Sequence, residues 1–233
     1  FEDGCDGVVV THGTDTLHLS SAALSFAWGG KGETPPGPIV FVGSQRSSDR
    51  GSSDATENLL SAVHWAANAP APCGDAGDGV VVVMHASNND GACAVYPGIG
   101  VRKLHSSRRD ACKPVTCEAL AVITIDNGTC SHARDERYQT TLNEKSSRRV
   151  CQRPTMYETS VRIAQFVAGP WLHSDEIEAI VLTGVQAVII QGTGLGHLPI
   201  DDPAKDAPEN TKLWRALTRC INREIPVVVT NQC

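Results

Sequence analysis

Short runs of β-branched and other apolar residues recur along the chain, and each run ends at glycine, proline or a group of polar residues. Runs of this length and composition predict strands that are buried on both faces of a sheet. We expect such strands at 8–10, 38–43, 79–84, 119–125, 161–167, 186–190 and 226–230.

Segments between these runs carry apolar residues at helical spacing. They predict helices at 15–28, from Asp54 to about Asn68, at 174–183 and at 209–223. Asp54 and Glu57 have the spacing of a capping box at the start of the second helix. Strands that alternate with helices predict a parallel sheet with right-handed crossovers.

This alternation predicts an α/β fold with a larger N-terminal parallel-sheet domain at 1–125 and a smaller C-terminal α/β domain at 156–233. Residues 126–155 are charged and have almost no apolar periodicity, so we interpret them as an interdomain linker. The chain begins at Phe1 without an initiator methionine, and it ends directly after a buried strand. We therefore expect a fragment that lacks the start of the first domain and the end of the second.

Composition narrows the class of protein. The formal net charge of −6 argues against binding nucleic acid through bulk electrostatics, because neutralising phosphates requires an excess of lysine and arginine. The nine cysteines are an odd number and contain no C-x-x-C pair, so free thiols in a reducing cytoplasm fit better than disulfides or a zinc site. No apolar run approaches the about 20 residues that cross a bilayer, and no signal peptide is recognisable.

The end of the first strand carries the most reactive group of side chains. Thr14 and Asp15 follow it, and the carboxyl end of a strand is where ligands bind in open α/β sheets. Both residue types are also common helix N-caps, and Lys103 in isolation is typical of a solvated surface charge. Together, a hydroxyl, a carboxylate and an amine are the groups with which an enzyme deprotonates a threonine nucleophile. The two interpretations differ in whether the fold brings these residues together.

Two other patterns carry less weight. The segment 192–197, Gly-Thr-Gly-Leu-Gly-His, is similar to a dinucleotide-binding fingerprint, but its glycine spacing and the following Pro199 favour a tight turn. His12, His85 and His105 are scattered and lack ligand spacing, so we expect no metal site.

Three motifs resemble a known family. Residues 6–16, Asp-Gly-Val-Val-Val-Thr-His-Gly-Thr-Asp-Thr, resemble the second catalytic motif of bacterial-type L-asparaginases. Residues 42–59 and 101–111 are more specific: they resemble the D subunit of the archaeal glutamyl-tRNA(Gln) amidotransferase and differ from plain asparaginases. Residues 191–197 and 226–233 also resemble that subunit, so the resemblance spans essentially the whole chain.

The resemblance implies a glutaminase-type amidohydrolase in which a threonine attacks the side-chain amide of glutamine or asparagine. It assigns Thr14, Asp15 and Lys103 to the catalytic set, and Gly13, Ser44 and Gln45 to substrate binding. The released ammonia would reach the E subunit of the amidotransferase, which binds Glu-tRNA(Gln) and uses ATP with Mg²⁺ to form Gln-tRNA(Gln) in the cytoplasm. This chain itself would bind no cofactor, and a homodimer within a heterotetramer is expected.

The chain also departs from the family. The Thr-Gly-Gly-Thr-Ile loop that carries the family's first nucleophilic threonine does not occur in the sequence, and residues 96–99 replace a basic, threonine-containing stretch. We therefore expect this chain by itself to be inactive or nearly so. A free-standing cytoplasmic asparaginase or glutaminase is the main alternative. A non-catalytic α/β binding module that uses Thr14 only as a helix cap is a third.

Overall fold

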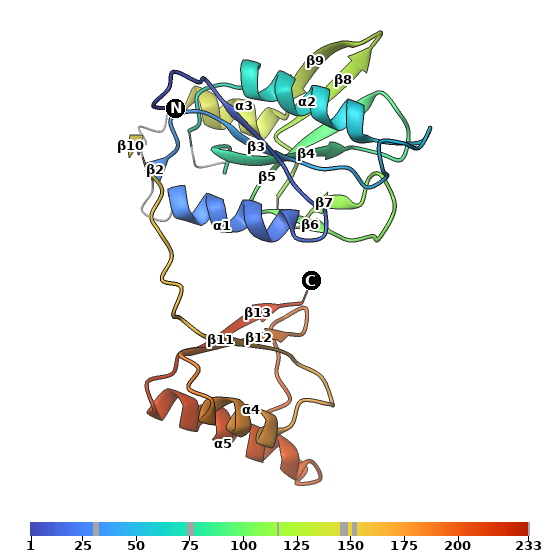
Figure 1. Cartoon of the computed structure of the whole chain (residues 1–233). Helices are drawn as coiled ribbons and strands as arrows, with labels where there is room; N and C mark the ends of the chain where they lie inside the picture. The colour runs from blue at the N-terminus through green and yellow to red at the C-terminus, as the bar shows by residue number, and fades with distance from the viewer. Residues whose placement is uncertain (30–32, 74–76, 116, 145–148, 151–152, 233) are drawn as a thin grey trace. The chain divides into compact units, whose positions relative to one another are not determined.

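The computed structural model of the chain describes residues 1–233 except 30–32, 74–76, 116, 145–148, 151–152 and 233. The chain divides into two compact units, Phe1–Tyr157 and Glu158–Cys233, each with its own sheet (Figure 1). None of the described helices is long and apolar enough to span a membrane.

The first unit is built on a sheet of six strands in the order β1-β3-β4-β5-β8-β9. The strands are β1 (Val8–Thr11), β3 (Ile39–Val42), β4 (Val80–His85), β5 (Ala92–Pro97), β8 (Ala121–Asp126) and β9 (Thr129–Arg134). The first three are mutually parallel and are connected through the helices α1 (Leu17–Gly29) and α2 (Ala55–Asn68). The α/β fold class is therefore confirmed, although the sheet is mixed, because β5, β8 and β9 add to it antiparallel.

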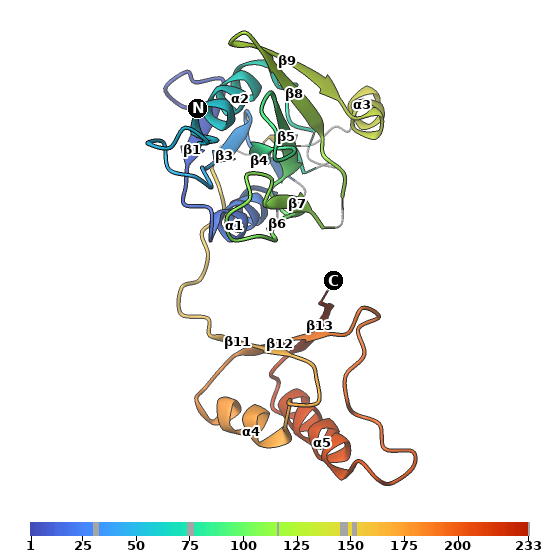
Figure 2. The same cartoon turned by 90° about the vertical axis from the view of Figure 1, so that its right-hand side faces the viewer.

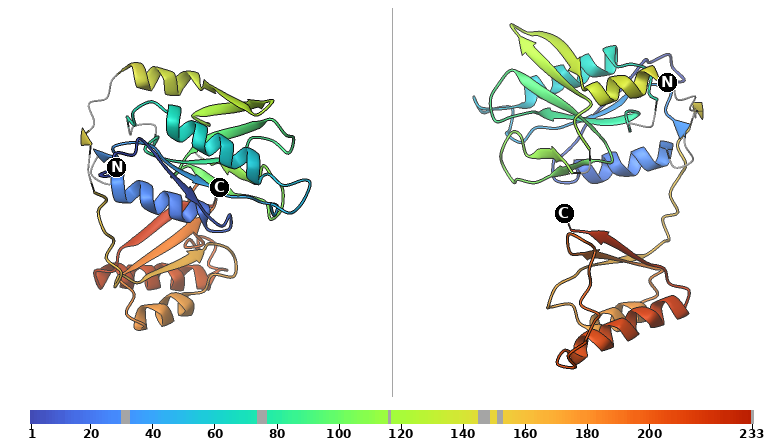
Figure 3. Two further views of the ribbon diagram at one scale, coloured as in Figure 1. Left: turned by 45° about the horizontal axis from the view of Figure 1, so that its top comes forward. Right: turned by 180° about the vertical axis from the view of Figure 1, so that it is seen from behind.

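Helices α1 and α2 cover opposite faces of this sheet (Figures 1 and 3). Val40 and Val42 of β3 pack with Trp65 of α2, whereas Ile39 and Phe41 of the same strand pack on the side of α1. Successive side chains of a strand point to opposite faces, so a strand that is covered on both sides must be apolar at every position. This explains the continuous valine runs in the sequence.

Residues 126–155, which we interpreted as a linker, contain regular structure that belongs to the first unit. Asn127 and Gly128 have φ values of 48° and 77°, and this left-handed pair closes a tight hairpin between β8 and β9. Helix α3 (Glu136–Asn143) follows, and its Tyr138 is buried in the core beside Trp65. The first unit consequently extends to Tyr157.

Two small sheets complete the first unit. Strands β6 (Val101–Lys103) and β7 (Cys112–Pro114) form an antiparallel hairpin that carries the loop 104–111. Strand β2 (Glu33–Thr34) pairs in parallel with β10 (Arg149–Val150). Strand β6 ends at Lys103, so the β6–β7 hairpin determines where this predicted site residue lies.

The second unit is a parallel sheet in the order β11-β12-β13, with α4 and α5 packed on one face (Figures 2 and 3). Its elements are β11 (Ile163–Val167), α4 (Ser174–Leu182), β12 (Ala187–Gly192), α5 (Pro208–Asn222) and β13 (Val227–Asn231). After β12 the chain makes a tight turn in which Thr193 N–H donates to His197 O, and Gly196 has a φ of 79°. The glycine-rich segment is thus a turn, and the next helix begins only at Pro208.

Candidate active site

The carboxyl ends of β1 and β3 lie side by side, and their following loops form the candidate site. Gly43, directly after β3, lies against the loop that follows β1. A Cβ atom at this position would lie 2.7 Å from His12 O and 2.8 Å from Thr14 Cγ2. Real Cβ atoms essentially never make such contacts, so glycine at 43 is required for Thr14 to occupy its position.

Lys103 joins the two predicted catalytic residues of the β1–α1 loop. Its Nζ donates to Thr14 Oγ1 at 2.9 Å and to Asp15 Oδ1 at 2.7 Å. The Lys103 side chain is 11% exposed, whereas Asp15 is 93% exposed. The hydrogen bond and charge of Lys103 lower the pKa of Asp15, so this carboxylate stays ionised beside the amine.

Thr14 and Asp15 do not serve as the helix cap that was the alternative interpretation of these residues. Helix α1 begins at Leu17, and the carbonyl of Thr16 accepts from the N–H groups of Leu19 and Ser20. Thr16 therefore holds the cap position. The Thr14 and Asp15 side chains are held by Lys103 instead.

The β6–β7 hairpin brings Lys103 to this place. Val101 is buried against the α1 side of the core, Arg102 is exposed, and Lys103 points back toward the β1–α1 loop, as the alternation of a strand requires. Leu104 N–H donates to Ala111 O at 2.8 Å and closes the base of the loop 104–111. The sequence separates Lys103 from Thr14 by 89 residues, so this contact is a product of the fold.

A cavity of about 410 Å³ lies at the carboxyl ends of β1 and β3 and matches the size range of small-molecule sites. The cavity is lined by Thr11, His12 and Gly13 at the end of β1, by Val42, Gly43 and Ser44 at the end of β3, and by Ala55 and Leu59 of α2. The predicted catalytic residues Thr14, Asp15 and Lys103 are not part of the lining; Gly13 directly precedes Thr14. Gly13 and Ser44, two of the predicted substrate-binding residues, thus face one cavity. Gln45 is not part of this lining.

Gln45 instead ties two loops together. Its Nε2 donates to Arg108 O at 2.9 Å and to His105 O at 3.4 Å, which links the loop after β3 to the loop 104–111. Because the second loop begins at Lys103, Gln45 connects the pocket wall to the segment that carries the amine. Its position supports the site geometry, while its predicted contact with substrate stays a prediction.

Asp54 belongs to this site, although the sequence pattern predicted it as part of a capping box of α2. Instead of capping α2, its buried carboxylate accepts from Ser44 Oγ at 2.9 Å and from the N–H groups of Gln45 and Arg46 at 3.0 and 2.9 Å. Burial raises the pKa of Asp54, but these hydrogen bonds outweigh it and hold the pKa below its usual value. The expected capping box is therefore wrong, because Asp54 organises the pocket loop and Glu57 contacts His85.

Comparison with known proteins gives the class to which this fold and site belong. Residues 1–136, more than half of the chain, match the family model described as asparaginase, N-terminal, so the chain belongs to the asparaginase family. The fold is that of a probable cytoplasmic L-asparaginase from Campylobacter jejuni, with a TM-score of 0.69, 20% identity, and coverage of 100% of this chain and 63% of that one. The fold is also similar to that of the thermostable L-asparaginase from Thermococcus kodakarensis. The TM-score is 0.70 at 24% sequence identity, and the match covers 99% of this chain and 58% of that one.

Curated relatives point to a particular member of that family, and they confirm the resemblance found in the motifs. The chain is 38% identical over 233 residues to the D subunit of the glutamyl-tRNA(Gln) amidotransferase of Methanosarcina mazei, covering 100% of this chain and 47% of the relative. It is 41% identical over 199 residues to the protein of the same name from Methanococcus vannielii, and this match covers 85% of this chain and 42% of the relative. The chain thus spans about half the length of the curated relatives that it matches.

Proposed function

We propose that this chain is the amidohydrolase part of the D subunit of a glutamyl-tRNA(Gln) amidotransferase. As part of the full-length protein, it would hydrolyse the side-chain amide of glutamine or asparagine and supply the ammonia that converts Glu-tRNA(Gln) to Gln-tRNA(Gln). Identity of 38–41% with subunits of that name supports the assignment. The observation that carries the chemistry is the Lys103 amine, which lies between the Thr14 hydroxyl and the Asp15 carboxylate.

In the proposed reaction these three residues move a proton. When Lys103 is in the amine form, its Nζ accepts the proton of the Thr14 hydroxyl across their 2.9 Å contact, and Thr14 in turn accepts the proton of the attacking hydroxyl group. Asp15 stabilises the resulting ammonium of Lys103 through its 2.7 Å contact. The proton then passes to the amide nitrogen as the C–N bond breaks, so that ammonia leaves and an acyl group remains for hydrolysis.

The amide substrate would occupy the cavity beside Thr14. The Ser44 hydroxyl lines this cavity and lies within hydrogen-bond distance of Arg46 O and Asp54 Oδ1, so its oxygen would accept from a ligand amino group. Gly13 leaves open space next to its backbone, because no atom lies within 4 Å of a Cβ built there. The attacking threonine that the resemblance implies is not in the sequence of this chain, so activity is proposed for the full-length protein.

The partners follow from the same proposal. The E subunit of the amidotransferase would receive the ammonia and bind Glu-tRNA(Gln), and the complex would use ATP with Mg²⁺ while this chain binds no cofactor. A homodimer within a heterotetramer, working in the cytoplasm, completes the proposal. A free-standing asparaginase or glutaminase is the second candidate; it is favoured by the shared fold with two L-asparaginases, which at 20% and 24% identity extends to the fold alone.

Ammonia release from glutamine by the full-length protein tests this function. The assay is run with and without the partner protein and Glu-tRNA(Gln). Stimulation by both additions supports the amidotransferase, and equal activity of the full-length protein alone supports the free amidohydrolase instead. Absence of ammonia release under every condition contradicts both, and leaves a non-catalytic member of the fold.

A further inference from the structure

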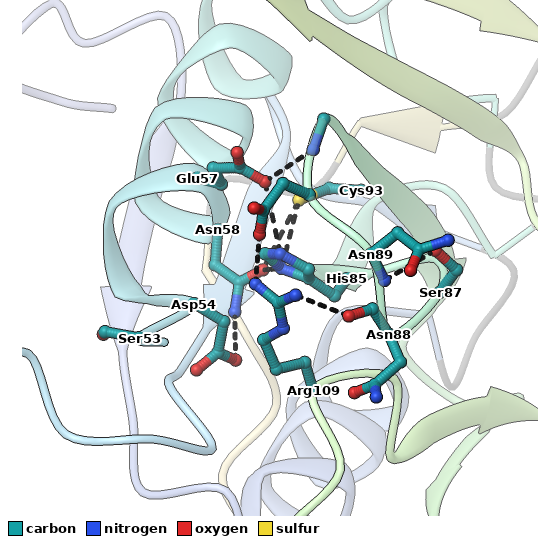
Figure 4. A network of polar contacts seen from close by, with 12 residues as sticks. Ser53, Asp54, Glu57, Asn58, His85, Ser87, Asn88, Asn89, Cys93 and Arg109 are labelled. Carbon is teal, nitrogen blue, oxygen red and sulfur yellow. Dashed lines mark hydrogen bonds and ion pairs between the residues drawn. The ribbon is translucent and has the colours of Figure 1, made fainter. Parts of the chain in front are cut away.

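A buried polar network lies beneath the candidate pocket, apart from Lys103. Figure 4 shows His85, the last residue of β4, at its centre, with Glu57 and Asn58 of α2 on one side and Arg109 close by. The His85 side chain is fully buried, with an exposure of 0%. A buried polar side chain of this kind needs a partner for each ring nitrogen.

The amide of Asn58 fixes which nitrogen of His85 carries a hydrogen. Asn58 Nδ2 donates to Gly43 O at 3.0 Å and to Asp54 Oδ2 at 2.9 Å. Both of these atoms are acceptors, so the amide nitrogen must face them and Asn58 Oδ1 must face the histidine. Oδ1 lies 2.6 Å from His85 Nδ1. His85 Nδ1 is therefore the protonated nitrogen.

The other nitrogen, Nε2, then meets a second acceptor. In the neutral ring Nε2 carries a lone pair, and it lies 3.2 Å from Glu57 Oε2. That oxygen already accepts from Gly91 N–H at 2.9 Å, and Nε2 makes no hydrogen bond to any described residue. Two lone pairs facing each other in a buried place repel, so a positive charge has to lie between them.

The charges around His85 also favour a cation. The carboxylates of Glu57, Asp54 and Asp90 face the ring, whereas Arg109 is the positive group among the described residues that act on it. With a neutral histidine this surrounding carries a net charge of −2. A divalent cation would neutralise it.

We propose that Glu57, His85 and Asp90 form a binding site for a divalent cation of the Zn²⁺ type. One ligand atom from each of them lies within 4.8 Å of the others. A separation of 3.2 Å between Nε2 and Oε2 corresponds to an angle of about 100° at an ion with bonds of about 2.1 Å, which suits zinc. An imidazole among the ligands favours Zn²⁺ over Mg²⁺ or Ca²⁺, which prefer oxygen alone.

The proposed ligands His85 and Glu57 are held by hydrogen bonds of the kind that orient metal ligands in proteins. A metal-binding histidine normally donates its second N–H to an oxygen, as His85 Nδ1 does to Asn58. Gly91 N–H fixes the orientation of the Glu57 carboxylate. Asp90 is 74% exposed and also contacts Arg109, so it would move toward the ion and exchange this ion pair for a metal bond.

No metal site was expected from the sequence, because His12, His85 and His105 lack ligand spacing. The proposed ligands come instead from α2, from the end of β4 and from the loop after β4, so sequence spacing could not reveal them. An ion at this place would tie the loop 86–91 to α2. Through Asn58, which bonds Gly43 and Asp54, it would also stiffen the wall of the pocket.

Zinc binding by the full-length protein tests the site independently of amide hydrolysis. The chelator-treated protein is dialysed against Zn²⁺ at increasing free concentration, and bound metal is measured by elemental analysis. Glu57→Gln keeps the side-chain size and the acceptor for Gly91 N–H but removes the charge. It should weaken the binding of one equivalent of zinc by about 100-fold or more, because mutating even the groups that hydrogen-bond a ligand lowers metal affinity by about 10–100-fold. Glu136→Gln is the matched control, since both glutamates lie in the first turn of a helix.

Neither substitution changes a cysteine, so any zinc bound by thiols should be equal in both variants. The difference in bound zinc between Glu57→Gln and Glu136→Gln therefore reports the proposed site alone. Nitrogen NMR of the His85 ring provides a second measurement in the wild-type protein: Zn²⁺ should leave Nδ1 protonated and shift the Nε2 resonance. Equal zinc binding by wild type and Glu57→Gln would overturn the proposal. So would a His85 ring that keeps protons on both nitrogens in excess Zn²⁺, because a proton would then occupy the gap.

Discussion

A single carboxylate at the start of α2, that of Asp54, organises the wall of the pocket. Asp54 is 0% exposed, yet its oxygens accept from one hydroxyl, two backbone N–H groups and the amide of Asn58. A buried donor or acceptor that loses its hydrogen-bond partner costs about 1–3 kcal/mol. The turn after β3 therefore has one favoured conformation, the one in which the Asp54 carboxylate and its donors are paired. Ser44 is presented to the cavity as a result.

Replacing Lys103 should remove catalysis and leave the fold. Lys103→Ala in the full-length protein deletes the amine that contacts Thr14 and Asp15, and we expect ammonia release to fall by about 10²–10⁴-fold, the range of a lost general base. Lys212→Ala, which removes a surface lysine of α5, is the control and should keep full activity. Unchanged turnover in Lys103→Ala would remove this residue from the mechanism.

A methyl group at Gly43 should disturb the same site by sterics alone. Gly43→Ala places a Cβ against His12 O and Thr14 Cγ2, so the β1–α1 loop must shift, at a cost of about 1–3 kcal/mol in unfolding free energy. Gly51→Ala has open space around its Cβ and serves as the control. Urea unfolding and ammonia release should both be impaired in the first variant, and equal behaviour of the two would disprove the steric argument.

The composition of the candidate site could be predicted from the sequence, whereas its contacts could not. Thr14, Asp15 and Lys103 have the types that the chemistry needs, and the motifs place them in one family. Their meeting depends on a hairpin that pairs Lys103 with Cys112, and no local pattern encodes that approach to the β1–α1 loop. Asp54 was misassigned because a helix cap and a loop organiser have the same local sequence signal.

At the scale of elements, the β6–β7 hairpin is held by one buried carboxylate. Arg108 donates to both oxygens of Asp110 at 2.9 Å, and Lys113 Nζ lies 3.1 Å from Oδ2. The hydrogen bond from Arg108 and the contacts with Lys113 lower the pKa of Asp110 to about 2, against the opposing effect of burial. This arrangement fixes the loop that begins at Lys103.

The depressed pKa of Asp110 makes a prediction for acid stability. A carboxyl whose pKa is lower in the folded state stabilises the fold above its unfolded pKa of 3.8, and this contribution is lost as the pH falls toward 2. Asp110→Asn should therefore be clearly less stable than wild type at pH 5, and the difference should shrink at pH 2.5. Thermal unfolding at both values measures it, with Asp49→Asn at an exposed loop position as the control. A difference that does not depend on pH would contradict the role of the ionised carboxylate.

Most elements of the fold could be read from hydrophobic periodicity, whereas β5, β9 and α3 were not expected from it. Strand β9 is a sheet edge with mostly exposed, polar side chains, so it lacks the alternation that marks a half-buried strand. Helix α3 spans eight residues and buries Tyr138 alone, too little for a periodic signal. A signal was nonetheless present, because Asp135 caps α3 by accepting from the N–H groups of Arg137 and Tyr138.

At the scale of the whole molecule, each unit has a complete core of its own. The two apolar clusters on the faces of the large sheet lie within 1–157, and the third lies within 158–233. Residues near the end of the first unit also bond back to it: Thr155 N–H donates to Ala27 O at 2.8 Å. The end of the first unit at Tyr157 is therefore set by contacts, which hydrophobic patterning alone does not display.

Two truncations of the chain distinguish the boundary that the sequence suggested from the one that the structure shows. A piece comprising 1–157 keeps both faces of the large sheet covered and should unfold in one cooperative transition by circular dichroism. A piece comprising 1–125 loses β9, which pairs with β8 along its length, and exposes the core beside Trp65 by removing Tyr138. Loss of a buried aromatic side chain alone costs about 3–5 kcal/mol, a large share of the stability of a small domain, so this shorter piece should not fold cooperatively. Cooperative unfolding of 1–125 at the same midpoint as 1–157 would show that the segment after β8 is a linker after all.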